Sequence, residues 1–359
     1  MTDGGGTWVL GVDSGGSGVR FALGRAEEGS PAEVSASDEP VRTGRTGIDA
    51  GHLLGQLVPA AMELLGRVGA DRVAAVAVGA AGMASLGDDL RAKLPPGLAG
   101  AFGVRRVALA ADAVTAYAGA LGQRPGAVVA AGTGMIALGT DLTRWRRADG
   151  WGHLLGDCGG GAWIGRAGLE AAMRAHDGRR GGSAALLARA EALFGPAPEL
   201  PGLLYPRTDR PAMLAAFAPE VARCAGSDPV AGAILREAAR GIAESAAAVC
   251  PGGRAVTPGA GAADGENAGA ARGVTADTAR GESVSECEVA LTGGLFRIGD
   301  PLLVPVREEL AALSPSARTV PAAGDPLAGA LLIASALARD ELRLPHHPRM
   351  LWVTTEQDT

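Results

Sequence analysis

The sequence has few cysteines, and they form no recognisable metal or disulfide pattern. Cys158, Cys224, Cys250 and Cys287 are widely separated and include no Cys-x-x-Cys pair. Zinc sites and small disulfide scaffolds use closely and regularly spaced cysteines. The spacing therefore indicates neither, and free thiols are the expected state.

The sequence also lacks a basic cluster and a long apolar run. Its 33 lysines and arginines are scattered among 39 acidic residues, which gives a net charge of -6. This balance argues against nucleic acid or an anionic membrane as a partner. No apolar run is long enough to cross a bilayer, and the first residues do not have the basic-then-apolar pattern of a secretion signal. We therefore expect a cytoplasmic protein with a small-molecule partner.

Glycine, in contrast, is abundant, with 56 among 359 residues, and it interrupts apolar runs in a regular way. The run Ala127 to Ala131 breaks at Gly132-Thr133-Gly134 and resumes from Met135 to Gly139, a pattern typical of a β-hairpin. The exposed amides of such a tight turn can hold phosphate oxygens. An ordinary turn of a glycine-rich protein would have the same pattern, so the residues alone leave both interpretations open.

A second hairpin is predicted near the N-terminus. The apolar run Trp8 to Val12 leads into Asp13-Ser14-Gly15-Gly16-Ser17-Gly18 and resumes from Val19 to Leu23. Here an acid ends the first strand, so Asp13 is placed to hold Mg²⁺ through water while Ser17 and the Gly15-Gly16 amides meet phosphate oxygens. The alternative is a type I′ turn that uses Asp and Ser for turn chemistry alone.

Two further acids lie at places where ligands bind. Asp157 is in the glycine-dense loop 156–161, which has too few large residues to bury it, so a solvated carboxylate is expected. Asp112 follows the strand predicted for Arg106 to Ala111 and begins a helix that continues to about Leu121. In open α/β sheets this edge is where ligands bind, although an Asp there can simply cap the helix.

The rest of the chain predicts helices and one insertion. Helical patterns cover 48–68 and, after Gly161, the segments 162–177, 183–194, 211–224 and 229–249. The stretch from Pro251 to Glu286 has almost no large apolar residues and is expected to be a flexible, dispensable insertion. Strand patterns return at 289–292 and 318–320, and a last helix begins after Asp325. A chain of this length favours two domains with a cleft between them.

Taken together and in order, these motifs resemble those of the actin-like ATPase and sugar kinase superfamily. The matching pieces are GVDSGGSGVR, AADAVTAYAGA, AAGTGM, GWGHLLGDCGGGAWIG, LTGGLF and DPLAGA. The resemblance is closest to the N-acetylglucosamine kinase branch, which also holds the BadF/BadG/BcrA/BcrD-type activator ATPases. It implies two ribonuclease-H-like α/β domains, residues 1–120 and 121–345, with a nucleotide and sugar cleft between them and the insertion 251–286 in the second domain.

The resemblance also implies a role for particular residues, with ATP and Mg²⁺ as cofactors. Asp112 corresponds to the catalytic base. The positions implied to bind ATP are Asp13, Ser14, Gly15, Gly16, Ser17, Gly132, Thr133, Gly134, Gly226, Gly293 and Gly294, with Asp13 also at the metal. The positions implied to bind the sugar are Thr43, Gly44, Asp112, Met135, Gly150, Trp151 and Asp157.

The expected activity is phosphorylation of an amino sugar by ATP, with the 6-hydroxyl of N-acetylglucosamine as the favoured acceptor. Two departures from the family pattern leave the sugar open. Cys158 stands where a Glu often follows the loop aspartate, and the loop at 41–47 has no Asn for an acetamido group. Glucosamine or another amino sugar is therefore an alternative, as is an activator ATPase with an iron–sulfur cluster. The oligomeric state stays open, with a homodimer as one alternative.

Overall fold

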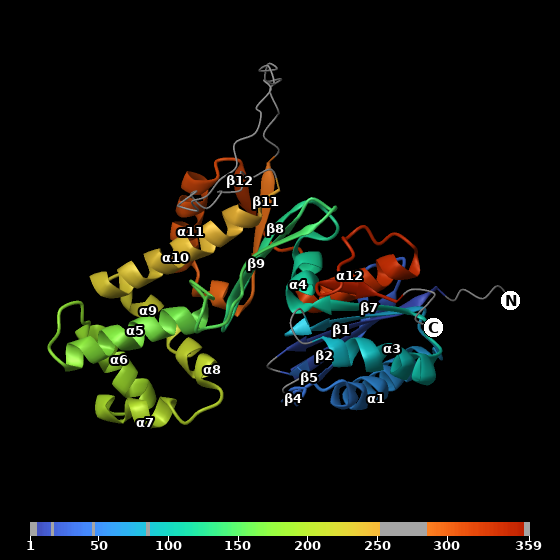
Figure 1. The fold of residues 1–359 in the computed structure, drawn as a ribbon, viewed down its shortest axis with the longest axis horizontal. Helices are drawn as coiled ribbons and strands as arrows, with labels where there is room; N and C mark the ends of the chain where they lie inside the picture. Colours follow the sequence, from blue (N-terminus) through green and yellow to red (C-terminus); the bar gives the residue numbers. More distant parts are fainter. Residues whose placement is uncertain (1–5, 16–17, 45–46, 84–86, 252–285, 355–359) are drawn as a thin grey trace, which may run out of the picture.

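The computed structural model describes residues 6–15, 18–44, 47–83, 87–251 and 286–354. Gly16 and Ser17, which belong to the turn of the hairpin predicted near the N-terminus, lie outside this part. Within it, the chain forms two sheets, each covered by helices, and a small two-stranded ribbon, β4 (Thr43–Gly44) with β5 (Gly47–Ile48). Two separate hydrophobic cores support these sheets. The predicted α/β class with two units is confirmed (Figure 1).

The first sheet has the strand order β13-β7-β6-β1-β2-β3. Its strands are β1 (Trp8–Gly15), β2 (Gly18–Arg25), β3 (Pro31–Ser37), β6 (Ala75–Ala80), β7 (Arg106–Ala111) and β13 (Leu351–Val353). Strands β1 and β2 form the predicted hairpin, closed by the pair Gly15 and Gly18, while β6 and β7 run parallel to β1. The carboxyl ends of three parallel strands therefore meet at one edge.

The second sheet has the order β10-β9-β8-β11-β12. Its strands are β8 (Gly126–Ala131), β9 (Met135–Thr140), β10 (Trp145–Asp149), β11 (Cys287–Thr292) and β12 (Ala317–Val320). The predicted hairpin around Gly132 to Gly134 is confirmed, with Ala131 opposite Met135. Strand β10, which the sequence did not predict, has a polar composition and forms through its pairing with β9.

Helices follow the periodic segments of the sequence. On the first sheet they are α1 (Ala50–Val68), α3 (Asp88–Phe102), α4 (Asp112–Leu121) and α12 (Pro326–Ala338). Around the second sheet they are α5 (Gly161–His176), α6 (Ala184–Phe194), α7 (Leu200–Leu204), α8 (Arg210–Ala215), α9 (Ala218–Cys224), α10 (Pro229–Val249) and α11 (Asp300–Leu313), with the short 3-10 turns η1 (Ala197–Glu199) and η2 (Gly294–Ile298). Asp49 and Asp228 cap α1 and α10 by accepting amides of the first turn.

The last helix, α12, packs on the first sheet rather than the second. It contacts α4, β1 and β6, and Figure 1 draws it in red beside the strands of the first unit. The two helices approach closely because both carry glycine at the contact: a Cβ on Gly329 would lie 1.9 Å from the Thr115 carbonyl oxygen. The expected boundary at 345 therefore differs from the structure, in which the chain leaves the first unit after α4 and returns with α12 and β13.

The cysteines also differ from the expectation of free thiols. Cys250 at the end of α10 and Cys287 at the start of β11 form a disulfide, with their Cα atoms 5.9 Å apart. Cys158 and Cys224 are free. Sequence spacing could not reveal the pair, because the two residues are 37 apart and meet only through the packing of α10 beside the second sheet. The insertion between them lies outside the described residues, apart from its first and last residue.

Candidate functional site

A cavity of about 450 Å³ lies between the two units, and we name it the central cleft. Its walls come from the strand ends of both sheets, as expected for open α/β sheets. From the first unit it has Asp112 and neighbouring residues of α4, with Pro326 and Met350. From the second unit it has Gly132, Gly134, Met135, Arg147, Gly150, Gly152, Asp157 and Gly293. Seven positions predicted from sequence thus surround one space.

Asp112 is the first residue of α4, and its side chain opens into the central cleft. It is not the N-cap, which is Ala111, although its Oδ1 accepts the Ala113 amide at 2.9 Å. The side chain remains accessible to solvent. The protein that surrounds the cleft nevertheless raises the pKa of Asp112 by desolvation, and the charge of Asp13 raises it further. A carboxylate in this setting is a better base than an ordinary Asp.

Asp13 does not line the central cleft, but its charge acts on Asp112, and an arginine fixes its side chain. Arg20 on the partner strand of the hairpin donates to Oδ2 of Asp13 at 2.6 Å and to Asp325 at 2.5 Å. Asp325 also caps α12 by accepting the Ala328 amide. Arg20 therefore ties the first hairpin to α12. Only one oxygen of Asp13 is engaged by Arg20, and no residue of the described chain donates to Oδ1.

The β8–β9 turn presents backbone groups without side-chain charge. Gly132 and Thr133 are exposed, and their carbonyl oxygens accept the first two amides of α5, from Gly161 at 2.9 Å and Ala162 at 2.8 Å. These bonds fix the turn against the start of α5. The amides of Thr133 and Gly134 make no backbone hydrogen bond that involves the described residues, so they are available to an anion.

Asp157 sits in the loop that precedes α5 and is 8% exposed, so the expectation of a solvated carboxylate is wrong. The residues around it are small, but the β8–β9 turn and the Gly152 amide cover it. Its Oδ1 accepts from Gly152 at 3.0 Å, and a Cβ on Gly134 would lie 2.4 Å from its Oδ2. Desolvation raises the pKa of Asp157, and the negative charge of Asp149 adds to the rise.

Asp149 is a residue of this site that the sequence did not reveal. Its carboxylate accepts the amides of Asp157 at 2.6 Å and of Cys158 at 2.8 Å, and so fixes the backbone that aims Asp157 into the cleft. Both aspartates have a left-handed backbone, with φ of 57° at Asp149 and 56° at Asp157. Asp adopts this conformation more readily than most residues. Because the sequence did not predict strand β10, it gave no reason to single out the acid at the end of this strand.

Arg147 on β10 is a second residue of the cleft that the sequence did not reveal. Its guanidinium lies 4.4 Å from the centre of the Trp151 ring and donates to the carbonyl oxygens of Asp149 and Gly150. It has no carboxylate partner within the described chain, and its charge lowers the pKa of Asp112. The described lining of the central cleft thus includes one arginine and two aspartates.

A second cavity, of about 720 Å³, adjoins the central cleft and is named the adjoining cavity. The β8–β9 turn separates the two, because Gly132 lines both. Beyond the turn the walls are mostly apolar and small, from Ala215, Ala218, Leu295 and Ile298, with the backbone of Gly294 among them. Small apolar walls suit a flat apolar group, and the adjacent turn offers amides to an anion. A nucleotide has both parts, a flat base and a phosphate chain.

The remaining predicted residues are placed less directly. Ser14 is buried and Gly15 ends β1, but neither lines the central cleft. Thr43 and Gly44 form β4. Trp151 is 65% exposed and stacks on Arg147 instead of lining the cleft. Gly226 lies in the turn after α9 and lines neither cavity, although Ala222 and Arg223 of α9 line the adjoining one.

Known proteins match both the sequence and this architecture. Residues 10–258 match the BadF/BadG/BcrA/BcrD ATPase family, which covers more than half of the chain, so the protein belongs to this family. In the described residues no helix is long and apolar enough to cross a membrane.

Particular relatives are kinases by their descriptions. An N-acetylmuramic acid/N-acetylglucosamine kinase of Clostridium acetobutylicum is 30% identical over 180 residues, which is 48% of this chain and 55% of that protein. The match thus spans about half the length of the relative. A structure from Chromobacterium violaceum, provisionally described as an N-acetylglucosamine kinase, has a TM-score of 0.61 at 25% identity and covers 92% of this chain and 99% of its own. A similarly described protein of Porphyromonas gingivalis has the same TM-score at 14% identity, covering 93% and 99%, and shows the fold alone.

Proposed function

We propose that this protein is an ATP-dependent sugar kinase that phosphorylates the 6-hydroxyl of an amino sugar, with N-acetylglucosamine as the favoured acceptor. The observation that carries the proposal is the position of Asp112. Its accessible carboxylate, with a raised pKa, shares one cavity with Asp157 and with a hairpin turn of open amides. Phosphoryl transfer needs phosphates and an acceptor hydroxyl held in position, and a base. In the central cleft the turn amides would hold the phosphates, Asp157 would hold the acceptor, and Asp112 would be the base.

In this proposal Asp112 is the general base. The acceptor hydroxyl oxygen attacks the γ-phosphorus of ATP, the bond from that phosphorus to the bridging oxygen breaks, and ADP leaves. Asp112 takes the proton of the attacking hydroxyl. Its raised pKa favours this role, because a base works best when its pKa is near the operating pH.

The nucleotide is expected to span both cavities. The γ- and β-phosphates would contact the open amides of Thr133 and Gly134, and the adenosine would occupy the adjoining cavity beside Gly293 and Gly294. The family membership supports ATP as the nucleotide.

The donor set near Asp13 fits Mg²⁺. This ion prefers oxygen ligands, keeps several waters and commonly binds through one or two carboxylates and substrate phosphates. Asp13 has one oxygen held by Arg20 and the other without a donor among the described residues. Asp13 would hold the ion through water, and the ion would supply neutralisation of the phosphate charge.

The sugar is expected to lie against Asp157, Met135 and the backbone of Gly150, where Asp157 can accept sugar hydroxyls. The Glu that often follows this aspartate in relatives is Cys158 here, and the loop Thr43 to Thr46 has no amide side chain. A site without polar partners for an acetamido group discriminates weakly. Glucosamine should therefore be used within about a hundredfold of N-acetylglucosamine in kcat/KM, a gap below about 3 kcal/mol.

A coupled ADP-release assay tests the proposal on N-acetylglucosamine, glucosamine, N-acetylmannosamine, N-acetylmuramic acid and glucose. N-acetylmuramic acid belongs in the panel because Arg147 offers a cation to its carboxylate, and a relative is described as acting on it. Sugar-dependent ADP release is expected. ATP hydrolysis that no sugar stimulates, with iron in anaerobically purified protein, would instead favour the activator ATPase.

The proposal also includes a cytoplasmic location, with no nucleic-acid or membrane partner. A monomer and a homodimer are both compatible with it. Sedimentation of the purified chain distinguishes these two states, and the kinase assay does not depend on the answer.

A further inference from the structure

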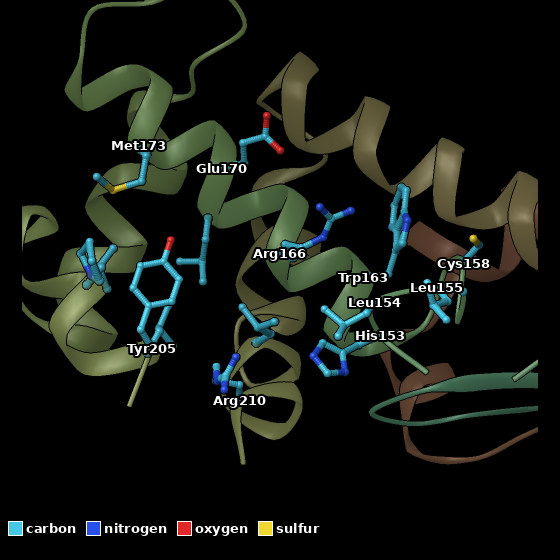
Figure 2. A pocket seen from close by; sticks show the side chains of 16 residues that line it. His153, Leu154, Leu155, Cys158, Trp163, Arg166, Glu170, Met173, Tyr205 and Arg210 are labelled. Atoms are coloured by element: carbon cyan, nitrogen blue, oxygen red, sulfur yellow. The ribbon is translucent and has the colours of Figure 1, made fainter. Parts of the chain in front are cut away.

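A third cavity, of about 550 Å³, lies in the second unit outside the central cleft, and we name it the lateral pocket. Figure 2 shows side chains of α5 along it, with the loop from His153 to Cys158 at one end and Tyr205 at the other. Its walls are largely apolar and include Trp163, Leu169, Met173, Leu200, Leu204 and Leu214. Its volume is within the range of small-molecule sites, about 300–1,000 Å³.

Exposed apolar side chains gather at this pocket. Leu154 is 81% exposed, Leu155 84% and Tyr205 74%, and all three line it. Large apolar side chains held in water around a concavity are typical of a binding site. The pocket therefore favours a ligand with an apolar body.

The charges of the lateral pocket are predominantly positive. Arg166 makes no ion pair or side-chain hydrogen bond within the described part of the chain, and Arg210 donates only to the carbonyl oxygen of Arg207, at 2.8 Å. Among the described residues of the walls, Glu170 is the one carboxylate, and Arg174 donates to it at 2.8 Å. Two guanidinium groups thus face the pocket without a direct carboxylate partner, and the ligand they suit is an anion.

One loop forms a wall of both the lateral pocket and the central cleft. Gly156 and Cys158 line the lateral pocket, whereas Asp157 between them lines the central cleft. The Asp149 carboxylate accepts the amides of both Asp157 and Cys158, so one side chain fixes the backbone on both sides of the loop. A ligand that fixes one side of the loop changes the free energy of binding on the other, and the coupling is reciprocal.

We propose that the lateral pocket is a second ligand site, which binds a small amphipathic carboxylate and is coupled through residues 152–158 to the central cleft. The apolar body lies along α5, and the positive charges of Arg166 and Arg210 attract the carboxylate. The binding part stands by itself, and only the coupling to sugar rests on the proposed function.

Calorimetry with octanoate tests the binding part, with octan-1-ol as the uncharged control. Octanoate should bind more tightly than octan-1-ol, and the difference should shrink as salt rises. Because both arginines are exposed, Arg166→Gln and Arg210→Gln should each weaken octanoate binding about threefold and leave octan-1-ol unchanged. Arg240→Gln is the matched control, since Arg240 pairs with Glu237 at 3.1 Å on α10 and does not line the pocket.

Alkylation of Cys158 gives an independent readout. The thiol is exposed in the lateral pocket and Cys224 is buried, so iodoacetamide should modify Cys158 first. The thiol is accessible but partly desolvated by the protein around it, and this desolvation and the Asp149 charge raise the pKa of the Cys158 thiol, so the reaction is run at alkaline pH. Octanoate should slow the alkylation of Cys158 in proportion to its occupancy.

Several outcomes would overturn the proposal. These are octanoate binding no tighter than octan-1-ol, an unchanged alkylation rate at saturation, or a dimer that buries Leu154 and Leu155 and excludes octanoate. Coupling is measured as a change in N-acetylglucosamine affinity when octanoate is present. Because calorimetry and alkylation need no phosphoryl transfer, they succeed or fail independently of the kinase proposal.

Discussion

The two sheets share an arrangement of strands. In each sheet, two antiparallel strand pairs lie next to two parallel strand pairs. The first unit has the order β3-β2-β1-β6-β7 and the second the order β10-β9-β8-β11-β12, with the same strand directions at every step. Figure 1 shows the two sheets as separate layers on either side of α4. The same backbone plan has thus been used twice.

The chemistry at corresponding places differs between the units. The first unit contributes the acids Asp13 and Asp112, one held by an arginine and one open to the cleft. The second contributes a turn without charge, and its acid, Asp157, is buried behind that turn. Under the proposed function, this difference predicts a division of work in which the first unit supplies metal and proton chemistry and the second holds the phosphates and orients the acceptor. The predictions below test that division.

The largest effect is expected from Asp112→Asn in the first unit. Asn keeps the size and the acceptor for the Ala113 amide but cannot take a proton, so turnover should fall by roughly 10²–10⁴. ATP and sugar affinities measured by calorimetry should stay within a few-fold. A variant that keeps most of its turnover would leave Asp112 as a structural residue of α4.

The same substitution should not destabilise the protein. The folded state raises the pKa of Asp112, so it binds this proton more tightly than the unfolded chain does. Stability from this group is present at low pH and is lost as pH rises towards the folded pKa. At neutral pH the charged Asp112 no longer contributes this stability. Asn carries no charge that burial can disfavour, so the melting temperature of Asp112→Asn should be equal or higher. A clear decrease would contradict the pKa direction.

An intermediate effect is expected from Gly134→Ala in the second unit. The new Cβ would lie 2.4 Å from Oδ2 of Asp157, so the carboxylate must move. A displacement of about 1 Å in a positioned group reduces kcat/KM by roughly 10- to 100-fold. The control is Gly55→Ala on α1, where a Cβ meets nothing within 4 Å and the helix should gain about 0.5–1 kcal/mol.

Arg147→Gln should have a smaller effect that depends on pH. The Arg147 charge lowers the pKa of Asp112, so its loss raises that pKa further. A base acts only when deprotonated, and the acid limb of kcat/KM should therefore move to higher pH while the alkaline plateau changes little. The shift is damped because Arg147 is exposed. An equal loss at all pH values would mean that Arg147 only holds the backbone of Asp149 and Gly150.

The two units also differ in what their sequence revealed. Both hairpins and Asp112 were predictable because glycine turns between apolar runs and an acid at a strand end are local signals. Arg147 and Asp149 were not, since β10 is a polar edge strand whose pairing with β9 depends on tertiary contacts. The α12 packing and the Cys250–Cys287 pair depend on contacts between distant segments, which no local pattern contains.

The smallest effect is expected from replacing residues 252–285 with a short Gly/Ser linker. The segment lies outside the described residues, but both of its flanks are held in the second core: Val249 and Cys250 are 1% exposed and Cys287 is 2% exposed. The Cα atoms of Cys250 and Cys287 are 5.9 Å apart, which a few residues can span. The entropy of closing a loop changes only slowly with its length. Turnover should therefore remain within a few-fold and the melting temperature nearly constant. Loss of turnover with an unchanged melting curve would instead make this segment part of the catalytic cycle, and the second unit would then contribute more than phosphate and acceptor binding.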